Sequence, residues 1–346
     1  MTISVIVPCR NEKLHIGEFL NTLFLQELEP GWRLEILVAD GRSDDGTRDI
    51  LQRYAEVRVI DNPERIVSTG LNAAIAAAKG DIIVRMDVHT SYAPDYIRQC
   101  VHVLEETGAD NVGGPWVAKG RGILGNAIAA AFQSRFCSGG GKAHDPGYEG
   151  EVDTVYLGCW SRSAFDKAGF FDTDLVRNQD DEFNFRLRRL GGRIWQSTRI
   201  KSAYEPRNSL SALFRQYLQY GFWKVAVIKK HRSLAAWRHL VPALLVSSIL
   251  IWIVAFALAA ALRLHQAAVA TGAALETELA VYFLACVAAA GRFARTVDPR
   301  VLLLVPGVMA VYHFAYGLGF VFGVLNRGDR ASGEETRHGL FTGLTR

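Results

Sequence analysis

Short apolar runs alternate with stretches of helical periodicity over roughly the first 190 residues of this chain. Buried strands are predicted for Ile3–Pro8, Leu34–Asp40, Val57–Asp61, Ile82–Asp87 and Val152–Leu157. Helices are predicted for Leu14–Leu25, Ser43–Tyr54, Ile66–Lys79, Pro94–Glu106, Arg162–Ala168 and Asn178–Leu190. Strands that alternate with helices at this spacing indicate an α/β fold, in which a mostly parallel sheet carries helices on both faces.

The pattern becomes strongly apolar toward the end of the chain. Val241–Leu262 and Val301–Leu325 contain no Asp, Glu, Lys or Arg over 22 and 25 residues, which is long enough to cross a bilayer. Leu279–Ala290 has only 12 residues, so it crosses only if its helix extends back past two glutamates or forward past Arg292. We expect two or three transmembrane helices. The alternative is a buried helical core or, for the middle segment, also an interfacial or re-entrant helix.

These patterns divide the chain into four parts. We expect an α/β domain over residues 1–205, interfacial amphipathic helices over 206–238, a membrane domain over 239–326 and a polar tail over 327–346. The aromatic spacing of Gln216–Trp223 suits a helix with one apolar face at a membrane surface. A glycine-rich stretch, Ser138–Gly150, is either a surface connection or a mobile lid over the site.

Charge and composition narrow the class of protein. The net charge of +4 is too small to argue for nucleic acid, and no zinc-finger or helix-turn-helix pattern occurs. The five cysteines form no CxxC pair, which argues against a disulfide framework or a zinc site. The apolar run at the start is too short for a signal peptide. The first apolar segment is preceded by the basic residues Lys229, Lys230, Arg232 and Arg238. Their position predicts that the α/β domain is cytoplasmic.

Carboxylates end two of the predicted strands and open the last predicted helix. Asp40 and Asp87 follow apolar runs, and residues 179–182 have the sequence Gln-Asp-Asp-Glu. A carboxylate at the end of a buried strand is costly without a partner. Ligands of parallel α/β sheets bind outside the carboxyl ends of the strands, so Pro8–Glu12, Asp40 and Asp87 should meet at one edge. These clusters predict one charged ligand that binds together with a metal ion.

Three sequence motifs occur in a fixed order: Val5–Glu12 (VIVPCRNE), Val38–Thr47 (VADGRSDDGT) and Gly80–His89 (GDIIVRMDVH). Together they resemble the GT-A glycosyltransferases of family 2, and the resemblance covers about residues 2–225. Asn62–Asn72 (NPERIVSTGLN), Val152–Trp160 (VDTVYLGCW) and the apolar tail are similar to bacterial exopolysaccharide glycosyltransferases of the succinoglycan ExoA type. The resemblance implies a GT-A fold and an inverting, metal-dependent transfer from a nucleotide-sugar.

The resemblance assigns nucleotide-binding positions. Asp40 matches the carboxylate that accepts the N3–H of uracil, a charge-assisted hydrogen bond worth about 1.5–3 kcal/mol. The other matching positions are Pro8, Arg10, Glu12, Arg65, Asn72 and Asp87. For Arg65, a phosphate partner in this interpretation, the alternative is a solvated arginine at a helix start. Asp44 and Asp45 are expected to cap the following helix instead.

Asp87-Val88-His89 occupies the place of the family's DxD motif, which holds the metal ion. A divalent cation there neutralises the diphosphate as it leaves. Because His89 stands where the family has its second aspartate, Asp87 and His89 are the expected metal ligands. Imidazole suits Mn²⁺ better than Mg²⁺, so the substitution favours Mn²⁺. The alternative is that His89 is structural.

The acidic cluster at 179–182, with Arg186 after it, resembles the family's catalytic motif. Asp180 matches the general base, which deprotonates the acceptor hydroxyl as it attacks C1. An acidic first turn that suits the helix dipole is the alternative. Asp181, Glu182 and Trp160 are candidate acceptor contacts, and a place in the core is the alternative for Trp160.

The expected function follows from this resemblance. Gln219 and Tyr220 replace the arginine and tryptophan that processive relatives carry, which argues against a polymer synthase. We expect transfer of a hexose from a UDP-sugar to a polyprenyl-diphosphate-linked saccharide in exopolysaccharide biosynthesis, at the bacterial inner membrane. The alternatives are transfer to polyprenyl phosphate or another lipid, and a non-catalytic scaffold that binds nucleotide-sugar. Other polysaccharide assembly proteins are candidate partners.

Overall fold

The structure is a computed structural model that describes residues 1–233, 236–326 and 341. The chain packs as two units. Met1–Ala118 and Gly141–Glu205 form unit 1, whereas Lys119–Gly140 and Pro206–Arg346 form unit 2. The polar tail expected at 327–346 lies outside the described residues except for Phe341, so it stays a prediction.

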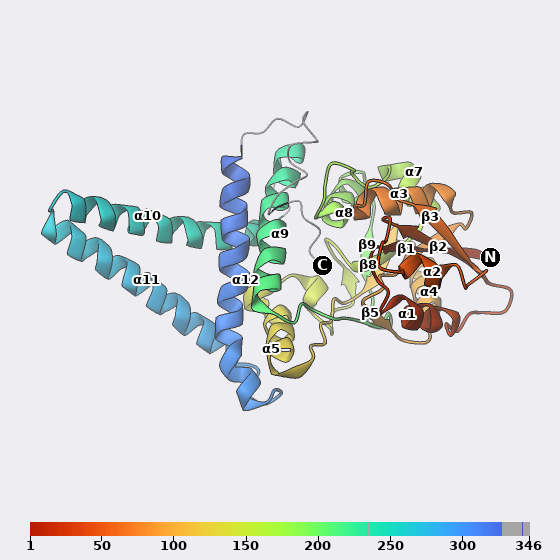
Figure 1. Cartoon of the computed structure of the whole chain (residues 1–346), viewed down its shortest axis with the longest axis horizontal. Coiled ribbons are helices and arrows are strands. Elements are labelled where there is room, and N and C mark those ends of the chain that lie inside the picture. Colours follow the sequence, from red (N-terminus) through yellow and green to blue (C-terminus); the bar gives the residue numbers. More distant parts are fainter. Residues whose placement is uncertain (234–235, 327–340, 342–346) are drawn as a thin grey trace. The chain divides into compact units, whose positions relative to one another are not determined.

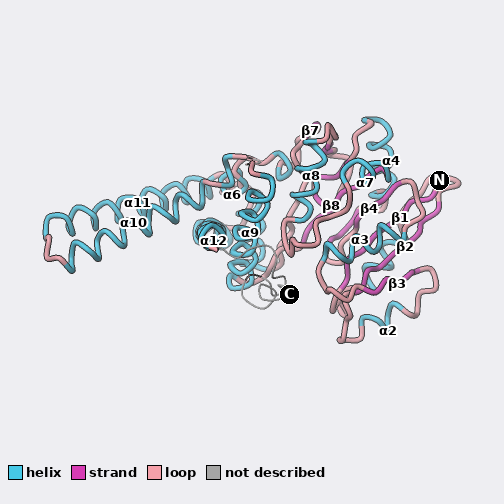
Figure 2. Tube along the Cα trace, turned by 90° about the horizontal axis from the view of Figure 1, so that it is seen from above, coloured by secondary structure: helices cyan, strands magenta, loops and turns pink. Residues whose placement is uncertain are grey.

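Unit 1 is built around one mixed sheet (Figures 1 and 2). Its strands are β1 (Thr2–Cys9), β2 (Arg33–Asp40), β3 (Val57–Asp61), β4 (Ile82–Arg85), β6 (Asn111–Gly114), β7 (Gly150–Glu151), β8 (Tyr156–Ser161) and β9 (Ile194–Gln196). They lie in the order β3-β2-β1-β4-β8-β6-β9-β7, and β5 (Thr90–Tyr92) pairs separately with β10 (Ser202–Tyr204). The first four strands in this order run parallel, and β8 is antiparallel to both neighbours. The carboxyl ends of β2, β1 and β4 therefore share one edge.

Helices cover both faces of this sheet because successive side chains of each strand point to opposite faces. They are α1 (Ile16–Phe24), α2 (Thr47–Leu51), α3 (Val67–Ala77), α4 (Tyr96–Thr107), α7 (Arg162–Ala168) and α8 (Gln179–Arg189). Val5 and Val7 of β1 belong to the core formed with α1 and α4, and Ile6 belongs to the core formed with α3, α7 and α8. The predicted α/β fold is confirmed.

One predicted strand of unit 1 is misplaced. The strand expected at Val152–Leu157 instead begins at Tyr156, as β8. Val152 and Val155 are 6% and 5% exposed, but they are buried from a loop. The apolar residues at 152 and 155 therefore suggested a strand where the chain forms a buried loop.

Residues 141–150, the part of the glycine-rich stretch that lies in unit 1, are held by hydrogen bonds to a buried side chain and by the burial of one of their own residues. Gln196 Nε2 donates to the carbonyl oxygens of Asp145 and Tyr148 at 3.0 and 3.1 Å. Ala143, in the short 3-10 helix η1 (Lys142–His144), is 2% exposed. These contacts fit a surface connection rather than a mobile lid.

The described residues of unit 2 are helical apart from their connections. The helices are α5 (Gly122–Gln133), α6 (Arg135–Ser138), α9 (Leu210–His231), η2 (Trp237–His239), α10 (Val241–Ala261), α11 (His265–Gly291) and α12 (Pro299–Leu325). Three segments of the described residues are long and apolar enough to cross a membrane: Trp237–Ala261, His265–Gly291 and Pro299–Leu325. α11 continues without a break across Glu278 and Glu276, which is the backward extension that the middle segment needs. α10 and α11 form a hairpin (Figures 1 and 2).

Interfacial helices are expected over residues 206–238. The structure instead has one long helix there, α9, which packs along α12. Glycines bring the two backbones into contact. A Cβ on Gly221 would lie 2.0 Å from the Tyr316 carbonyl oxygen, and one on Gly319 would lie 1.9 Å from that of Leu218. Gly323 similarly meets the backbone of the next turn of α9. The contact positions rise together in both helices, so α9 and α12 run parallel.

α5 and α6 belong to unit 2, although they lie inside the predicted 1–205 domain. α5 packs on α12, and the Tyr312 hydroxyl donates to the Ile128 carbonyl oxygen at 3.3 Å. The sequence of α5 (GILGNAIAAAFQ) has no charged residue, so it suits a helical core as well as an α/β domain. The predicted boundary at 205 therefore overlooks this excursion of the chain.

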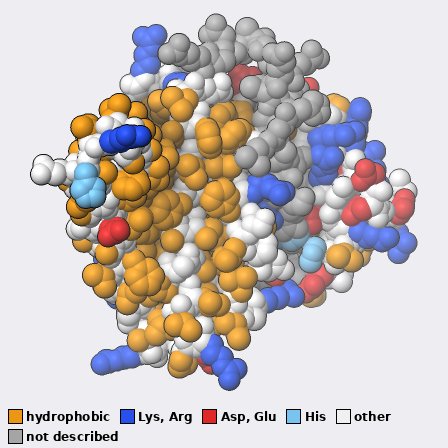
Figure 3. All heavy atoms as spheres, turned by 60° about the vertical axis from the view of Figure 1, so that its left-hand side comes forward, with side chains coloured by type: hydrophobic (Ala, Val, Ile, Leu, Met, Phe, Trp, Pro, Cys, Tyr) orange, Lys and Arg blue, Asp and Glu red, His pale blue; other side chains and the backbone are white. Residues whose placement is uncertain are grey.

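The three long helices differ in how much of their apolar surface the protein itself covers. In their most apolar stretches, 17% and 11% of the residues of the first and second segments are buried, against 44% of the third. Figure 3 shows hydrophobic side chains gathered on the face where the α10–α11 hairpin comes forward. A buried helical core is thus excluded for α10 and α11 within the described residues, and we expect lipid around them.

Candidate active site

The loops after β1 and β2 meet at the carboxyl edge of the sheet. Cys9 and Asp40 are register partners, and the Gly41 N–H donates to the Cys9 carbonyl oxygen at 2.8 Å. The Asn11 N–H donates to Ser43 Oγ at 2.8 Å. The two loops that carry the first two motifs are therefore held together by their backbones.

The two aspartates at the start of α2 have different roles. Gly46 is the N-cap residue of α2, so the predicted capping by Asp44 and Asp45 is wrong, although the Asp45 carboxylate accepts the N–H groups of Thr47 and Lys13 at 2.9 and 3.0 Å. Burial alone would raise the pKa of Asp45, but these hydrogen bonds outweigh it and the pKa is lowered. Asp44 contributes its backbone N–H, which donates to Asn11 Oδ1 at 3.0 Å.

Asp40, the predicted uracil contact, is fully buried at this edge. Its carboxylate accepts hydrogen bonds from the N–H and hydroxyl of Ser43 and is ion-paired with Arg48. A base would reach the carboxylate only in exchange for one of these partners. Pro8 and Arg10 lie half-buried in the neighbouring loop. Their nucleotide contacts stay predictions.

Asp87 follows β4 and is held by Arg85, the last residue of that strand. Nε and Nη2 of Arg85 donate to its two carboxylate oxygens at 2.8 and 2.9 Å, a bidentate pair. Burial alone would lower the pKa of Arg85, but the charges of Asp87 and Asp180 outweigh it and the pKa is raised. Two of the predicted site carboxylates, 93 positions apart in the sequence, therefore act on one buried cation.

Two tyrosines complete this cluster. The Tyr92 hydroxyl accepts the Asp87 N–H at 2.6 Å and donates to the Asp87 carbonyl oxygen at 3.0 Å. The Tyr156 hydroxyl lies 2.6 Å from Thr90 Oγ1. Burial raises the pKa of both phenols well above the ordinary value. Sequence reasoning singled out neither tyrosine nor Arg85.

His89 does not join Asp87. Its Nε2 pairs with the Glu12 carboxylate, and its ring packs edge-on against His15 with centroids 4.6 Å apart. Across residues 1–233, 236–326 and 341, no group of three or more His, Cys, Asp and Glu side chains is arranged to hold a metal. The predicted ligand pair is therefore not supported, because Asp87 is turned to Arg85 and His89 to Glu12. The argument for Mn²⁺ over Mg²⁺ fails with it, and the nucleotide contact of buried Glu12 stays a prediction.

The first turn of α8 carries the third acidic cluster, where the helix dipole favours carboxylates. Asp180 and Asp181 are half-buried, and the Asp181 N–H donates to Asp180 Oδ1 at 2.9 Å. Glu182 is fully buried and accepts two hydrogen bonds from Arg186 at 3.1 and 2.9 Å. The prediction that Glu182 contacts the acceptor is wrong, because its carboxylate is used inside the protein. The roles of Asp180 and Asp181 stay predictions.

Trp160 is a core residue. It is 1% exposed and packs against Phe165, Phe171 and Phe183, with centroids 5.6, 6.0 and 6.2 Å away. Its ring has no face open to a sugar, so the acceptor contact predicted for it is wrong and the core alternative is correct.

Asn72 and Arg65 flank the start of α3. The Asn72 side chain donates to the Phe171 carbonyl oxygen at 2.8 Å and accepts the Phe171 N–H at 2.9 Å. This amide ties α3 to the segment before α8, which gives it a structural use in place of the predicted nucleotide contact. Arg65 is exposed, with a positive φ of 61°, and its phosphate contact stays a prediction.

Comparisons with known proteins identify relatives of this chain. The sequence profile of glycosyl transferase family 2 matches residues 4–163. The succinoglycan biosynthesis protein ExoA of Rhizobium meliloti (strain 1021) is 34% identical over 245 residues, which cover 69% of this chain and 73% of that protein. A Methanococcus voltae protein, named dolichyl N-acetyl-alpha-D-glucosaminyl phosphate 3-beta-D-2,3-diacetamido-2,3-dideoxy-beta-D-glucuronosyltransferase, is 28% identical over 240 residues, which cover 66% and 74%.

A solved structure shares the fold. The mannosyltransferase PcManGT from Pyrobaculum calidifontis, determined in complex with GDP-Man and Mn²⁺, superimposes with a TM-score of 0.57. The match covers 94% of this chain and 88% of that one at 20% sequence identity. At this identity the likeness concerns the fold alone.

Proposed function

This chain belongs to glycosyltransferase family 2, and we propose that it moves a hexose from a UDP-sugar to a saccharide carried on a polyprenyl diphosphate. As an enzyme it is a GT-A glycosyltransferase of exopolysaccharide or lipid-linked sugar biosynthesis. The observation that carries the proposal is the buried Arg85 with its bidentate partner Asp87 and the charge of Asp180 acting on it. This cluster lies beyond β4, at the edge shared with the loops of the first two motifs.

Asp180 is our candidate for the general base. Inverting transfer needs one carboxylate that takes the proton of the acceptor hydroxyl as it attacks C1 from the face opposite the nucleotide. The half-buried Asp180 lies in the first turn of α8, and the charge of Arg85 favours the ionised form of a nearby carboxylate. Asp181, in the same turn, is our candidate contact for the acceptor.

The donor is proposed to bind at the loops after β1 and β2. Asp40 would accept the uracil N3–H in place of the Ser43 hydroxyl, while Pro8 and Arg10 line the uridine pocket. Arg65 is exposed before α3 and would pair with the phosphates.

Asp87 would hold a divalent cation, since Mg²⁺ usually takes one or two protein carboxylates together with substrate phosphates. When bound, the cation neutralises the diphosphate leaving group. Arg85 orients the Asp87 carboxylate through two hydrogen bonds, and Tyr92 holds the Asp87 backbone through two more. Oxygen ligands suit both Mg²⁺ and Mn²⁺, so we propose a divalent metal without preference between them.

The acceptor is proposed to be lipid-borne, at the inner membrane, with unit 1 in the cytoplasm. The relative named for succinoglycan biosynthesis supports a saccharide acceptor in polysaccharide assembly. A second candidate function is transfer onto a lipid phosphate, and the relative whose name includes a dolichyl phosphate sugar favours it. In both cases the exposed apolar hairpin explains how the chain reaches an acceptor that stays in the bilayer.

The test uses membranes that contain the full chain, a panel of UDP-sugars, and Mg²⁺ or Mn²⁺. UDP release and product masses are measured with and without polyprenyl-diphosphate-linked saccharides. We expect release that requires the lipid acceptor, disappears in Asp180→Asn and persists in Asp166→Asn, a matched change at an exposed position of α7. A product with a lipid monophosphate would support the second candidate. Release without acceptor, unchanged in Asp180→Asn, would contradict both and leave a nucleotide-sugar-binding scaffold.

A further inference from the structure

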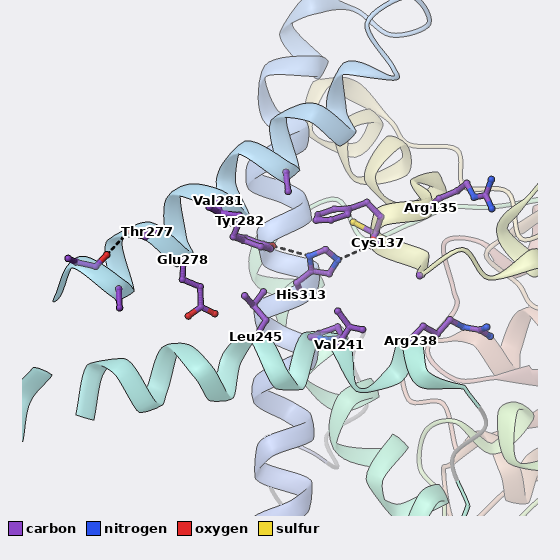
Figure 4. Close-up of a pocket in the computed structure, with 16 residues that line it drawn as sticks. Arg135, Cys137, Arg238, Val241, Leu245, Thr277, Glu278, Val281, Tyr282 and His313 are labelled. Carbon is purple, nitrogen blue, oxygen red and sulfur yellow. Dashed lines mark hydrogen bonds between the residues drawn. The ribbon is translucent and has the colours of Figure 1, made fainter. Parts of the chain in front are cut away.

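A cavity of about 1000 Å³ lies within unit 2, where α6, α10, α11 and α12 meet (Figure 4). Its walls are mainly apolar and include Val241 and Leu245 of α10 and Val281 and Ala285 of α11. The cavity opens to the surface between the helices, and its volume is at the upper end of the range for small-molecule sites, which makes it a candidate ligand site.

Charged side chains lie at opposite ends of this cavity. Arg135 of α6 and Arg238 of η2 lie at one end, with their guanidinium groups turned outward from the other lining side chains, and Glu278 of α11 lies toward the other end (Figure 4). The stem of Arg238 packs closely on Gly139, where an added Cβ would lie 2.6 Å from the Arg238 Cβ. The Glu278 carboxylate accepts the hydroxyl hydrogen bond of Ser248 from α10. This distribution orients an elongated ligand with its anionic end at the arginines.

A hydrogen-bond chain fixes the walls. Tyr282 Oη lies 2.9 Å from His313 Nδ1, and His313 Nε2 lies 3.2 Å from the Phe136 carbonyl oxygen (Figure 4). A carbonyl only accepts, so Nε2 carries the proton and Nδ1 accepts from the tyrosine hydroxyl. The chain links α11, α12 and α6, so the cavity is a formed site rather than a loose gap.

The helices around the cavity place it at the membrane surface. α9 carries four basic residues, which makes it unfit to cross hydrocarbon: Arg215, Lys224, Lys229 and Lys230. α12 runs parallel to α9 in backbone contact through Gly221 and Gly319, so we infer that it lies at the surface together with α9. In Figures 1 and 2 α12 passes across the base of the α10–α11 hairpin, which leaves the hairpin as the crossing element.

The distribution of charge along the α10–α11 hairpin agrees with a cavity at the membrane surface. Its tip carries Arg263, whereas basic residues crowd its base before α10 and after α11: Arg232, Arg238, Arg292, Arg295 and Arg300. Basic residues collect on the cytoplasmic side of membrane proteins. Trp237, which is 80% exposed beside Arg238, also suits the interface. Arg135 and Arg238 therefore lie at the depth of lipid head groups.

We propose that this cavity binds the polyprenyl phosphate part that both candidate acceptors share, with the phosphate on Arg135 and Arg238 and the hydrocarbon chain along α10 and α11. The inference deepens the proposed function and rests on it, because the bound lipid is the carrier of the acceptor. Two guanidinium groups match the oxygens of a phosphate. A phospholipid of the bilayer shares this chemistry, but bulk lipid needs no built cavity, and the test separates the two.

The test is lipid binding to the purified full chain in detergent, measured by native mass spectrometry. The probes are a long-chain polyprenyl phosphate, the unphosphorylated polyprenol and phosphatidylglycerol. We expect the polyprenyl phosphate to bind tightest. Joint Arg135→Gln and Arg238→Gln changes should weaken it roughly ten- to hundred-fold, the effect of losing charged hydrogen bonds. Arg295→Gln, a matched change at the hairpin base that does not line the cavity, should leave binding unaltered.

Ala274→Leu, which fills the cavity, gives an independent readout. It should lower binding of polyprenyl phosphate and polyprenol alike while the thermal unfolding of the protein is retained. Three results would each overturn the site. The double arginine variant could bind polyprenyl phosphate as tightly as the native chain, or Arg295→Gln could lose as much binding as the double variant. Phosphatidylglycerol could also bind as tightly as polyprenyl phosphate. Normal sugar transfer by Ala274→Leu would overturn the site and spare the proposed function. Lipid binding as predicted without any sugar transfer by the native chain would do the reverse.

Discussion

The two units of this protein treat polar groups in opposite ways. At the sheet edge of unit 1, charged side chains are paired with one another, as in Arg85 with Asp87 and Arg48 with Asp40. In unit 2 the α10–α11 hairpin leaves most of its apolar surface uncovered, and the few polar groups near it, such as Glu278, face a cavity. Unit 1 thus satisfies its own charges, whereas unit 2 exposes apolar surface that suits a lipid environment.

Glycine shows the same contrast. Gly46, with a φ of +99°, allows the turn that begins α2 in unit 1, a conformation that residues with a Cβ rarely adopt. Gly319 of unit 2 has an ordinary helical conformation. Glycine is needed there because a Cβ would clash with the Leu218 carbonyl oxygen. Glycine serves backbone conformation in unit 1 and backbone contact between helices in unit 2.

The largest expected effect breaks unit 1 alone. Asp180→Asn removes the proposed base, and we expect a loss of roughly 10²- to 10⁴-fold in kcat, the usual contribution of general base catalysis. Binding of the UDP-sugar should be retained, because Asp180 belongs to the acceptor side of the proposed site. Steady-state transfer and equilibrium donor binding check both parts. A variant with normal kcat would remove Asp180 from the mechanism.

The second prediction concerns the sidedness of unit 2. Single cysteines at Leu264, at the hairpin tip, and at Asn326, after α12, are labelled with an impermeant maleimide in sealed vesicles, with Asp166→Cys marking the side of unit 1. Because only the hairpin should cross, we expect Asn326→Cys to label with Asp166→Cys and Leu264→Cys to label from the opposite side. The native cysteines set the background. Labelling of Asn326→Cys together with Leu264→Cys would mean that α12 crosses as well.

The third prediction tests the glycine contact between α9 and α12. Gly319→Ala should lower the free energy of unfolding by about 1–3 kcal/mol, as overpacking does elsewhere. Gly307→Ala is the matched control on the same helix, because its Cβ would meet nothing within 4 Å. Thermal unfolding in detergent measures both. Equal unfolding temperatures would show that the two helices do not depend on this contact.

A smaller effect is expected from the buried arginine of unit 1. Arg85→Lys keeps the charge but loses the bidentate geometry that orients Asp87, and we expect a roughly tenfold higher KM for the metal or the donor. Lys167→Arg, a change of similar size at an exposed pair with Asp110, serves as control. Titration of metal at fixed donor separates the two. An unchanged KM for both would show that Arg85 has only a structural role.

The smallest effect concerns acid stability. The Glu35 carboxylate accepts hydrogen bonds from Ser4 Oγ at 2.6 Å and the Lys79 N–H at 2.7 Å. Burial alone would raise its pKa, but these bonds and nearby basic residues bring it below the ordinary 4.5. Since the pKa is lowered on folding, this stabilisation is present above pH 4.5 and is lost as the pH falls through the folded value.

Glu35→Gln should therefore flatten the loss of stability below pH 4.5 by a small amount. Denaturant unfolding of the native chain and the variant at several acidic pH values measures the difference. Parallel pH profiles would show that Glu35 does not contribute to it.

Much of unit 1 could be predicted from the sequence, because strand and helix periods are local properties. β3 and α7 have the predicted boundaries, and the loops of the first two motifs meet where strand direction requires. The half of the sheet that contains antiparallel strands was harder to predict from the sequence. β8 runs antiparallel, and its neighbours β6 and β9 are only four and three residues long, too short for a clear period.

The partners of site residues depend on tertiary structure and are harder to predict. His89 stands two positions after Asp87, yet Glu12 takes its imidazole and Arg85 takes the aspartate. Glu182 looks like part of the acidic cluster, but one helical turn brings Arg186 to it. The sequence showed which residues are charged at the sheet edge, and the packing decided which charges stay inside the protein.

Unit 2 shows the same limit for helices. Apolar length predicted α10 and α12 but could not distinguish α10, which the protein leaves largely uncovered, from α12, which packs along the basic helix α9. The evidence for that difference lies in Gly221 and Gly319, whose meaning appears only when α9 is placed beside α12. α5 joined unit 2 for a similar reason, since an uncharged helix fits either unit.

The most direct test of the account compares one acceptor saccharide in two forms, linked to polyprenyl diphosphate and released from it. Sugar transfer to each is measured with the native chain and with Asp180→Asn. We predict that the native chain uses the lipid-linked form at far lower concentration and that Asp180→Asn uses neither. Equal use of the two forms would contradict the role of unit 2. Donor binding without transfer to either form, under conditions where the donor sugar is correct, would contradict the assignment of the chain as a lipid-acceptor glycosyltransferase.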